Sequence, residues 1–106
     1  MDTRDAKTRY VVFHTPGPSW SRGVDFREQA GIEGHVAHYR ELYEQGHLDL
    51  GGPFLLPDLG GMMVAVPGYP MEDLIAFAAR DPAVVQSGLL EYEVRPWYTA
   101  MDQRSG

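Results

Sequence analysis

The chain has 106 residues, of which 9 are basic and 15 are acidic, giving a formal net charge of −6. This length predicts a single domain over residues 1–106, and a hydrophobic content of 43% is typical of a globular protein. The acidic balance argues against a nucleic-acid partner, because such proteins concentrate lysine and arginine, and the lack of cysteine excludes disulfides and thiolate chemistry.

The first half of the chain predicts a strand, a long loop and a helix. Residues 10–13 form a short apolar run that is typical of a strand buried on both faces. The prolines and glycines of residues 14–23 interrupt regular structure, and residues 26–45 then place apolar side chains at helical spacing. Gly46 follows as a residue that can end this helix in the left-handed conformation.

Two strands are predicted after this helix. Residues 47–51 alternate between polar and apolar side chains, so we expect a half-buried strand with Leu48 and Leu50 on the same face. A turn rich in glycine and proline follows, and residues 62–66 are apolar on both faces.

A second helix and a final strand complete the pattern. Pro70 suits the start of a helix, and Asp81 is expected to end that helix because it precedes Pro82. Residues 89–96 alternate again, which predicts another half-buried strand.

The element order β-α-β-β-α-β predicts an α+β, ferredoxin-like fold with a four-stranded antiparallel sheet. In this topology the first and third strands are central, and these are the two strands with apolar residues on both faces. Two helices cover only one face of such a sheet. We therefore expect a second copy to pack on the other face, which would make the protein a homodimer.

The sequence contains no segment that predicts export or membrane insertion. The N-terminal run MDTRDAKTR is charged, unlike a secretory signal peptide, and no apolar run approaches the roughly 20 residues that span a bilayer. Because disulfides are also absent, we expect a cytoplasmic protein without a membrane partner.

Short motifs over residues 9–98 resemble the YciI-like family, also described as YCII-related or DGPF-containing. The resemblance lies in the runs HVAHYRELYEQGHLDLGGPF, DLGG and DPAVVQSGLLEYEVRPW. The matching positions are His35, Gly46, Gly52-Pro53, Gly61, Asp81-Pro82, Gly88 and Pro96-Trp97. The loop HTPGPSWSRGVDF departs from the family, because it is longer and richer in proline than in the shortest members.

The resemblance implies the dimeric α+β barrel superfamily, in agreement with the topology argued above. It also implies that His35 and Asp81 correspond to the catalytic pair suspected in the family. One relative removes chloride from a chlorinated hydroxyhydroquinone, and cousins in the superfamily are lactone isomerases and cofactor-free oxygenases. We accordingly expect no cofactor.

The residues by themselves leave two interpretations of His35 open. Its place on the apolar side of the first helix is typical of a hydrogen-bonded core or interface histidine. A catalytic histidine needs a carboxylate that fixes one tautomer, and Asp81 lies at the end of a helix on the same face of the sheet. Such a pair would transfer protons near neutral pH, in isomerisation, HX elimination or lactone chemistry.

Candidate substrate-binding residues are His14, Trp20 and Pro53. His14 ends the first strand beside the proline-rich loop, and Trp20 in that loop is either a packing anchor or an aromatic pocket wall. We expect the pocket to be bounded by the first helix, this loop and the end of the second helix.

A metal site is a further alternative, because His35 and His38 lie three residues apart on the helix and His47 and Asp49 follow on a strand. The two helical histidines point in different directions around the helix, so we expect no resident metal.

These observations predict a small cofactor-independent enzyme of lyase, isomerase or dehydrochlorinase type, acting on a small cyclic or enolic substrate through a His-Asp pair. The alternative is a non-catalytic dimeric module that binds a small molecule or serves as an accessory to another protein.

Overall fold

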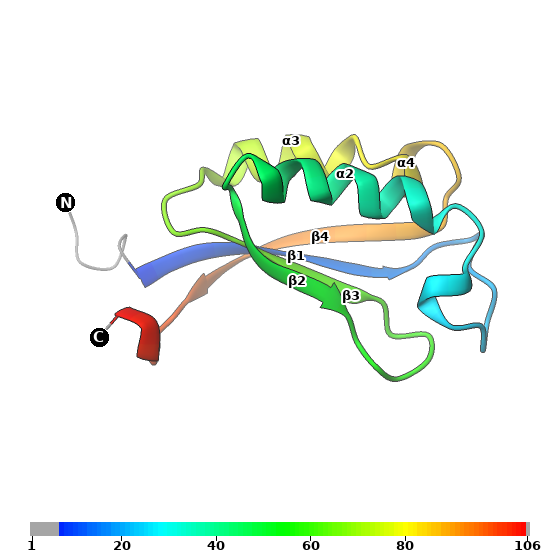
Figure 1. Cartoon of the computed structure of the whole chain (residues 1–106), viewed down its shortest axis with the longest axis horizontal. Helices are drawn as coiled ribbons and strands as arrows, with labels where there is room; N and C mark the ends of the chain where they lie inside the picture. The colour runs from blue at the N-terminus through cyan, green and yellow to red at the C-terminus, as the bar shows by residue number, and fades with distance from the viewer. Residues whose placement is uncertain (1–6, 106) are drawn as a thin grey trace.

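The structure is a computed structural model that describes residues 7–105. Its strands are β1 (Thr8–Pro16), β2 (Leu48–Pro53), β3 (Gly61–Ala65) and β4 (Leu90–Tyr98). Its helices are α2 (Ile32–Glu44), α3 (Met71–Ala79) and the short α4 (Pro82–Val85), with 3-10 turns η1 (Phe26–Glu28) and η2 (Gln103–Ser105). Figure 1 shows the α-helices lying together over one face of the sheet. No helix within the described residues is long and apolar enough to cross a membrane.

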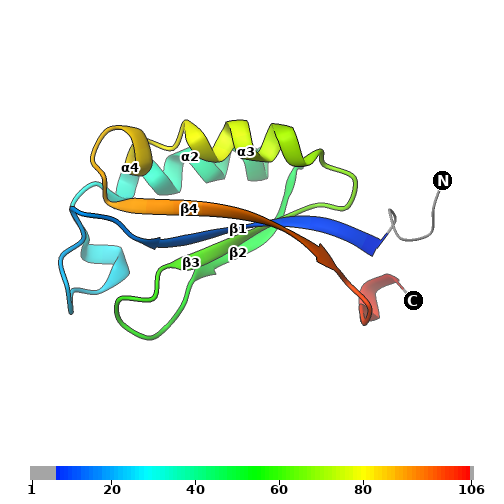
Figure 2. The same cartoon turned by 180° about the vertical axis from the view of Figure 1, so that it is seen from behind.

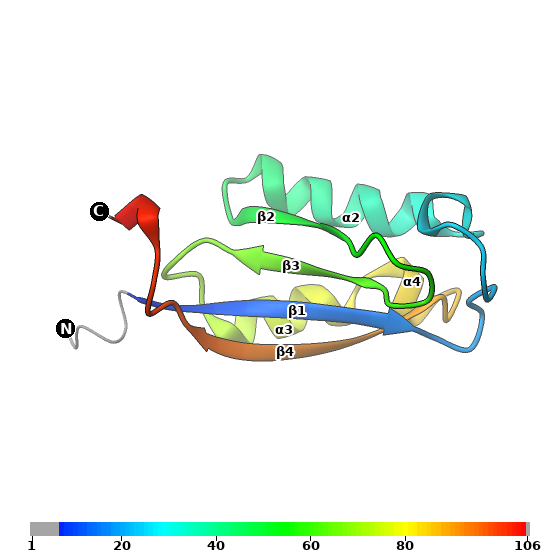
Figure 3. The ribbon, with the colours of Figure 1, turned by 90° about the horizontal axis from the view of Figure 1, so that it is seen from below.

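The four strands form one antiparallel sheet in the order β2-β3-β1-β4. In the view from below, β1 and β3 lie in the centre of the sheet, and β2 and β4 form its edges (Figure 3). The predicted α+β, ferredoxin-like arrangement is therefore confirmed, including the prediction that the first and third strands are central.

The main core lies between the sheet and the helices α2 and α3. Val12 of β1 is fully buried there, against Tyr39 and Leu42 of α2 and Leu74 of α3. A second apolar cluster is made up of Trp20, Ile32, Ala83, Leu89 and Leu90. This second cluster brings the loop after β1, the start of α2, and α4 into contact, and so holds one end of the candidate site.

The opposite face of the sheet is not covered by the helices α2 to α4, as the view from behind shows (Figure 2). Val12 points toward the helices, so alternation along β1 turns Val11 and Phe13 toward this face. Val11 lies opposite Val64 in the ladder and Phe13 lies opposite Met62, so the apolar surface continues onto β3. We call this surface the uncovered face.

The first helix is shorter than predicted. Residues 26–28 form only the turn η1, and α2 begins at Ile32 rather than near Phe26. The reason is Gly31, whose φ of 94° lies in the left-handed region and is incompatible with a continuous right-handed helix.

The prediction that Leu48 and Leu50 share a face is wrong. In the ladder between β2 and β3, Leu48 lies opposite Ala65 and Leu50 lies opposite Val64. Two residue steps along β2 therefore match one step along β3. This mismatch is a β-bulge at Asp49, and the side chains of β2 that follow the bulge point to the opposite face of the sheet. Leu48 is buried in the main core, whereas Leu50 is 48% exposed.

Gly60→Ala should destabilise the protein more than Gly68→Ala does. Both glycines have a positive φ, 78° and 89°, so alanine is unfavourable by roughly 1–2 kcal/mol at either position. A Cβ at Gly60 would also collide with the backbone carbonyl of His14 in a central strand, whereas a Cβ at Gly68 meets no atom within 4 Å.

We expect the loss of unfolding free energy to be at least about 2 kcal/mol larger for Gly60→Ala than for Gly68→Ala. Chemical denaturation at one protein concentration measures both, and equal losses would show that the strand at His14 yields to the added methyl group.

Candidate active site

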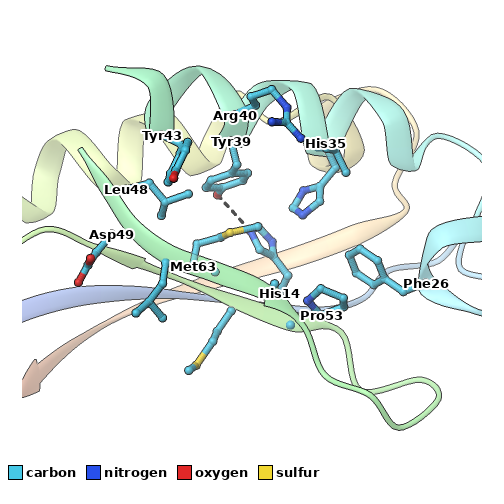
Figure 4. A pocket seen from close by; sticks show the side chains of 16 residues that line it. His14, Phe26, His35, Tyr39, Arg40, Tyr43, Leu48, Asp49, Pro53 and Met63 are labelled. Carbon is cyan, nitrogen blue, oxygen red and sulfur yellow. Dashed lines mark hydrogen bonds between the residues drawn. The ribbon is translucent and has the colours of Figure 1, made fainter. Parts of the chain in front are cut away.

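A cavity of about 500 Å³ opens between α2 and the strands β2 and β3. His14 from β1 and Phe26 from η1 complete its wall (Figure 4). The wall carries apolar groups such as Met63, while the buried polar groups are the rings of His14, His35 and Tyr39. Phe26, the last residue of the loop HTPGPSWSRGVDF, lines the cavity together with α2, as expected. The expected end of the second helix does not line it, and residues of β2 and β3 form the wall there instead.

His35 and Asp81 meet at the back of this cavity. Nδ1 of His35 donates a hydrogen bond to Oδ2 of Asp81 over 2.6 Å, and the two side chains are only 1% and 0% exposed. The contact that we expected from the sequence is therefore present. Its catalytic role stays a prediction.

Asp81 does more than end a helix, which corrects the prediction from its place before Pro82. α3 ends at Ala79, and Asp81 is the N-cap of α4, with Oδ1 accepting a hydrogen bond from the backbone N–H of Ala83 over 2.9 Å. Proline suits the first turn that follows, since its missing N–H would have no partner there. One carboxylate oxygen thus begins a helix while the other holds the ring of His35.

These contacts keep Asp81 ionised. Burial raises the pKa of the Asp81 carboxyl, but the hydrogen bonds from the His35 ring and the Ala83 N–H outweigh burial, and the pKa lies below its usual value. An ionised carboxylate only accepts hydrogen bonds, so Nδ1 of His35 carries a proton, and in the neutral ring Nε2 is the nitrogen that can accept one.

A second polar pair lies beside the first. Nε2 of His14 and the hydroxyl of Tyr39 are 3.0 Å apart, and both side chains are at most 2% exposed. The rings of His14 and His35 meet edge to face with centroids 4.7 Å apart. Burial and then the nearby His35 lower the pKa of His14 to about 4, so His14 is neutral at physiological pH. Burial, followed by the charge of Asp81, raises the pKa of Tyr39, which keeps its hydroxyl protonated.

Tyr39 was missed as a site residue in the sequence, where its apolar neighbours assign it to the buried side of the helix. The signal that could have found it is its spacing, since it lies one turn after His35 on α2 and shares its face. Tyr39 contacts His14, which lies on the separate strand β1, and the residues around Tyr39 in the sequence do not predict this contact.

Two of the three predicted substrate-binding residues line the cavity, namely His14 and Pro53. Trp20 does not. It packs against Phe26 in the second apolar cluster, and its indole N–H donates to Oδ1 of Asp58 over 2.7 Å. The packing interpretation of Trp20 therefore describes its position, and the tryptophan supports the cavity from behind Phe26.

The residues of the proposed metal alternative lie apart. His38 donates from Nε2 to the backbone carbonyl of Phe77 over 2.7 Å, and its ring stacks on the Phe77 ring. His47 lies against a tyrosine ring, and Asp49 accepts hydrogen bonds from two arginines. None of these three side chains reaches His35 in the described part of the chain.

Three other potential ligands do cluster, because one ligand atom each from His14, His35 and Asp81 lies within 4.8 Å of the others. The 2.6 Å between His35 and Asp81 is a hydrogen-bond distance. Two ligands of one tetrahedral metal ion, each about 2.1 Å from it, would lie roughly 3.4 Å apart. The cluster is therefore arranged to share a proton and would have to open to bind a metal.

The comparisons with known proteins place the chain in a family. Residues 8–98 match the YCII-related domain, so the chain belongs to that family. Among curated proteins none matches the sequence.

A similar solved structure is the 5-chloro-2-hydroxyhydroquinone dehydrochlorinase from Burkholderia phenoliruptrix, in complex with 2,5-dihydroxybenzoquinone. It is 18% identical, with a TM-score of 0.57, over 84% of this chain and 92% of the dehydrochlorinase chain. At this level of identity the similarity establishes a shared fold.

The neutral, buried state of His14 predicts a specific pH dependence of stability. Above a pH of about 6.5 the ring is neutral in both the folded and the unfolded chain. Between about pH 6.5 and pH 4 the unfolded chain binds the proton and the folded chain does not, so the free energy of unfolding falls as the pH falls.

The loss reaches about 3 kcal/mol, which His14→Gln should remove. Chemical denaturation at pH 7, 5.5 and 4 measures it, with His47→Gln as the control. An unchanged pH dependence in His14→Gln would show that His14 is protonated in the folded protein.

Proposed function

We propose that this protein is a cofactor-independent enzyme that moves a proton on a small cyclic or enolic substrate, in a reaction of lyase, isomerase or dehydrochlorinase type. The observation that carries the proposal is the 2.6 Å hydrogen bond between His35 and the buried Asp81, beside a cavity of about 500 Å³. An imidazole held in one tautomer next to a ligand-sized cavity is the arrangement that general acid–base catalysis requires.

The pair supports proton abstraction followed by proton return or loss of a leaving group. Nε2 of His35 takes a proton from the substrate, and the Asp81 carboxylate stabilises the resulting imidazolium through the Nδ1 hydrogen bond. In an isomerisation the proton returns at another atom of the substrate. In an HX elimination the electrons of the C–H bond form a double bond, the halide leaves with the electrons of the C–X bond, and solvent removes the proton from His35.

The structural neighbour supports the substrate class. That protein is a dehydrochlorinase of a hydroxyhydroquinone, and its complex contains a quinone. The cavity here is lined by Phe26, Tyr39 and Met63, which offer aromatic and polarisable contacts to a flat ring.

Asp81→Asn tests this function, because asparagine retains an oxygen for the α4 cap but removes the carboxylate charge. On a halogenated phenol, enol or lactone that the wild type converts, we expect kcat to fall by about 10²–10⁴-fold. Asp73→Asn, an exposed substitution in the first turn of α3, is the matched control and should retain activity.

Nitrogen-15 NMR of the histidine rings gives a readout that needs no substrate. We expect His35 to show a single Nδ1–H tautomer in the wild type and a mixture of tautomers in Asp81→Asn. A His35 ring that does not respond to this substitution would contradict the proposed mechanism.

A non-catalytic binding module is the second candidate. The observation that favours it is the nearly complete burial of the His35 and Asp81 side chains. A histidine that is 1% exposed and bonded to a fully buried carboxylate can also serve to join two helices. In that case ligands would bind in the cavity, no turnover would follow, and His35→Gln would reduce stability without changing any reaction rate.

We also propose that the protein is a homodimer that packs through its uncovered face. The face carries apolar side chains on the central strands, and Trp97 of β4, which lies opposite Arg9, remains 48% exposed on it. Val11 and Val64 are already buried within one chain, so sheet-on-sheet packing of two copies would bury Trp97 and the half-buried Phe13 and Met62. The isologous contact would close as a pair.

Trp97→Glu should convert the dimer to a monomer at micromolar concentration, because a carboxylate would be buried without a partner in the interface. Val85→Glu, which places the same charge on α4 at a residue that is 61% exposed, is the control and should stay dimeric. Multi-angle light scattering measures the mass of both. A wild type that is monomeric under these conditions would rule out this proposal.

A further inference from the structure

The proposed proton transfer uses His35 and Asp81 and leaves the second polar pair of the cavity without a role. The hydroxyl of Tyr39 and Nε2 of His14 are 3.0 Å apart at the buried end of a cavity whose lining is otherwise mainly apolar (Figure 4). A buried hydroxyl and a buried imidazole are costly to maintain unless their hydrogen bonds are used.

The hydrogen-bonding capacity of this pair is incompletely used. Among the described residues, Nδ1 of His14 has no hydrogen-bond partner of good geometry, although the nearby backbone of Glu91 acts to raise the pKa of the ring. The well-formed hydrogen bond of the ring is the one between Nε2 and Tyr39. The Tyr39 hydroxyl can both donate and accept, and His14 occupies only one of these functions. The remaining function of the hydroxyl is available to a ligand in the cavity.

The pair has two uncharged states. When His14 carries its proton on Nδ1, Tyr39 donates to Nε2 and its oxygen accepts a hydrogen bond from a ligand hydroxyl. When His14 carries its proton on Nε2, it donates to Tyr39, and the Tyr39 hydroxyl donates to a ligand carbonyl or oxyanion. The same two side chains therefore suit a ligand oxygen before and after that oxygen loses its proton.

We propose that Tyr39 binds an ionisable enol or phenol hydroxyl of the substrate, and that His14 is a positioning residue that orients the Tyr39 hydroxyl. This inference rests on the proposed function and names the substrate class of that same cavity. A ligand that enters as a carboxylate or phosphate fits less well, because the pair offers no positive charge and Arg40, a cation of the lining, is an exposed residue.

The geometry also separates the two proton acceptors of the site. His14 and His35 lie with ring centroids 4.7 Å apart, and a charge on one ring disfavours a charge on the other. Burial holds His14 neutral, so the substrate proton goes to His35, and Tyr39 contacts the substrate oxygen without taking up charge.

The test compares two probes that differ at one group, 4-nitrophenol and its methyl ether 4-nitroanisole. In the wild type we expect 4-nitrophenol to bind about tenfold more tightly, because only the phenol can donate to Tyr39. Tyr39→Phe should remove this preference and leave the affinity for 4-nitroanisole unchanged. Tyr69→Phe, which alters a tyrosine outside the cavity, should keep it.

His14→Phe and His14→Gln examine the positioning role. Loss of orientation should reduce the preference for the phenol in His14→Phe, whereas His14→Gln, whose amide can still bond to Tyr39, should restore most of it. A purely structural role of His14 would lower the affinities for both probes equally. Such a parallel loss, or a preference that survives Tyr39→Phe, would overturn the proposal.

A failure of the inference on Tyr39 can be distinguished from a failure of the proposed function. A wild type that binds neither probe, or binds both equally, overturns the inference on Tyr39 while the tautomer measurement on His35 still decides the proton-transfer mechanism. A preference that disappears in Asp81→Asn but persists in Tyr39→Phe would show that the His35–Asp81 pair holds the hydroxyl, which also overturns the inference.

Discussion

The carboxylate of Asp81 is the contact on which the arrangement of the helices and the candidate site both depend. Its Oδ1 caps α4 through Ala83, and its Oδ2 holds the ring of His35 on α2, so one buried group joins the corner after α3 to the neighbouring helix. Each bond stabilises the ionised carboxylate that the other needs, because an ionised carboxylate accepts at both oxygens. The local requirement for a cap and the chemical requirement for an oriented histidine are met by one side chain.

Around this contact the cavity divides into a charged pair and an uncharged pair. Asp81 is ionised and accepts a hydrogen bond from the ring of His35, while His14 and Tyr39 are buried and remain neutral. The proximity of the two histidine rings makes this division necessary, since both cannot be charged within 4.7 Å of each other without a large cost. Under the proposed function, this division would separate proton uptake from oxygen binding and would suit substrates whose reacting carbon lies beside a hydroxyl or a carbonyl.

The two faces of the sheet serve different functions in the two proposals made above. The helices and the cavity occupy one face, and the position of the β-bulge at Asp49 decides which side chains of β2 belong to it. Leu48 closes the core under α2, whereas Leu50 is turned to the uncovered face with the apolar side chains of β1 and β3. The proposed dimer would bury the uncovered face, whose Leu50 and Met62 also border the cavity, whereas His35 and Asp81 lie on the helix side of the sheet.

The sequence by itself determined the features that depend on local periodicity and turn chemistry. The element order, the central position of β1 and β3, and the apolar face on which His35 lies follow from spacing along the chain. The left-handed Gly31 and the bulge at Asp49 were missed, because a hydrophobic pattern does not reveal where a ladder or a helix is interrupted. Only the tertiary structure decided that Tyr39 meets His14, 25 residues away, and that Trp20 packs behind the cavity wall. Contacts of this kind are set by how the helices lie on the sheet, and no local propensity encodes that packing.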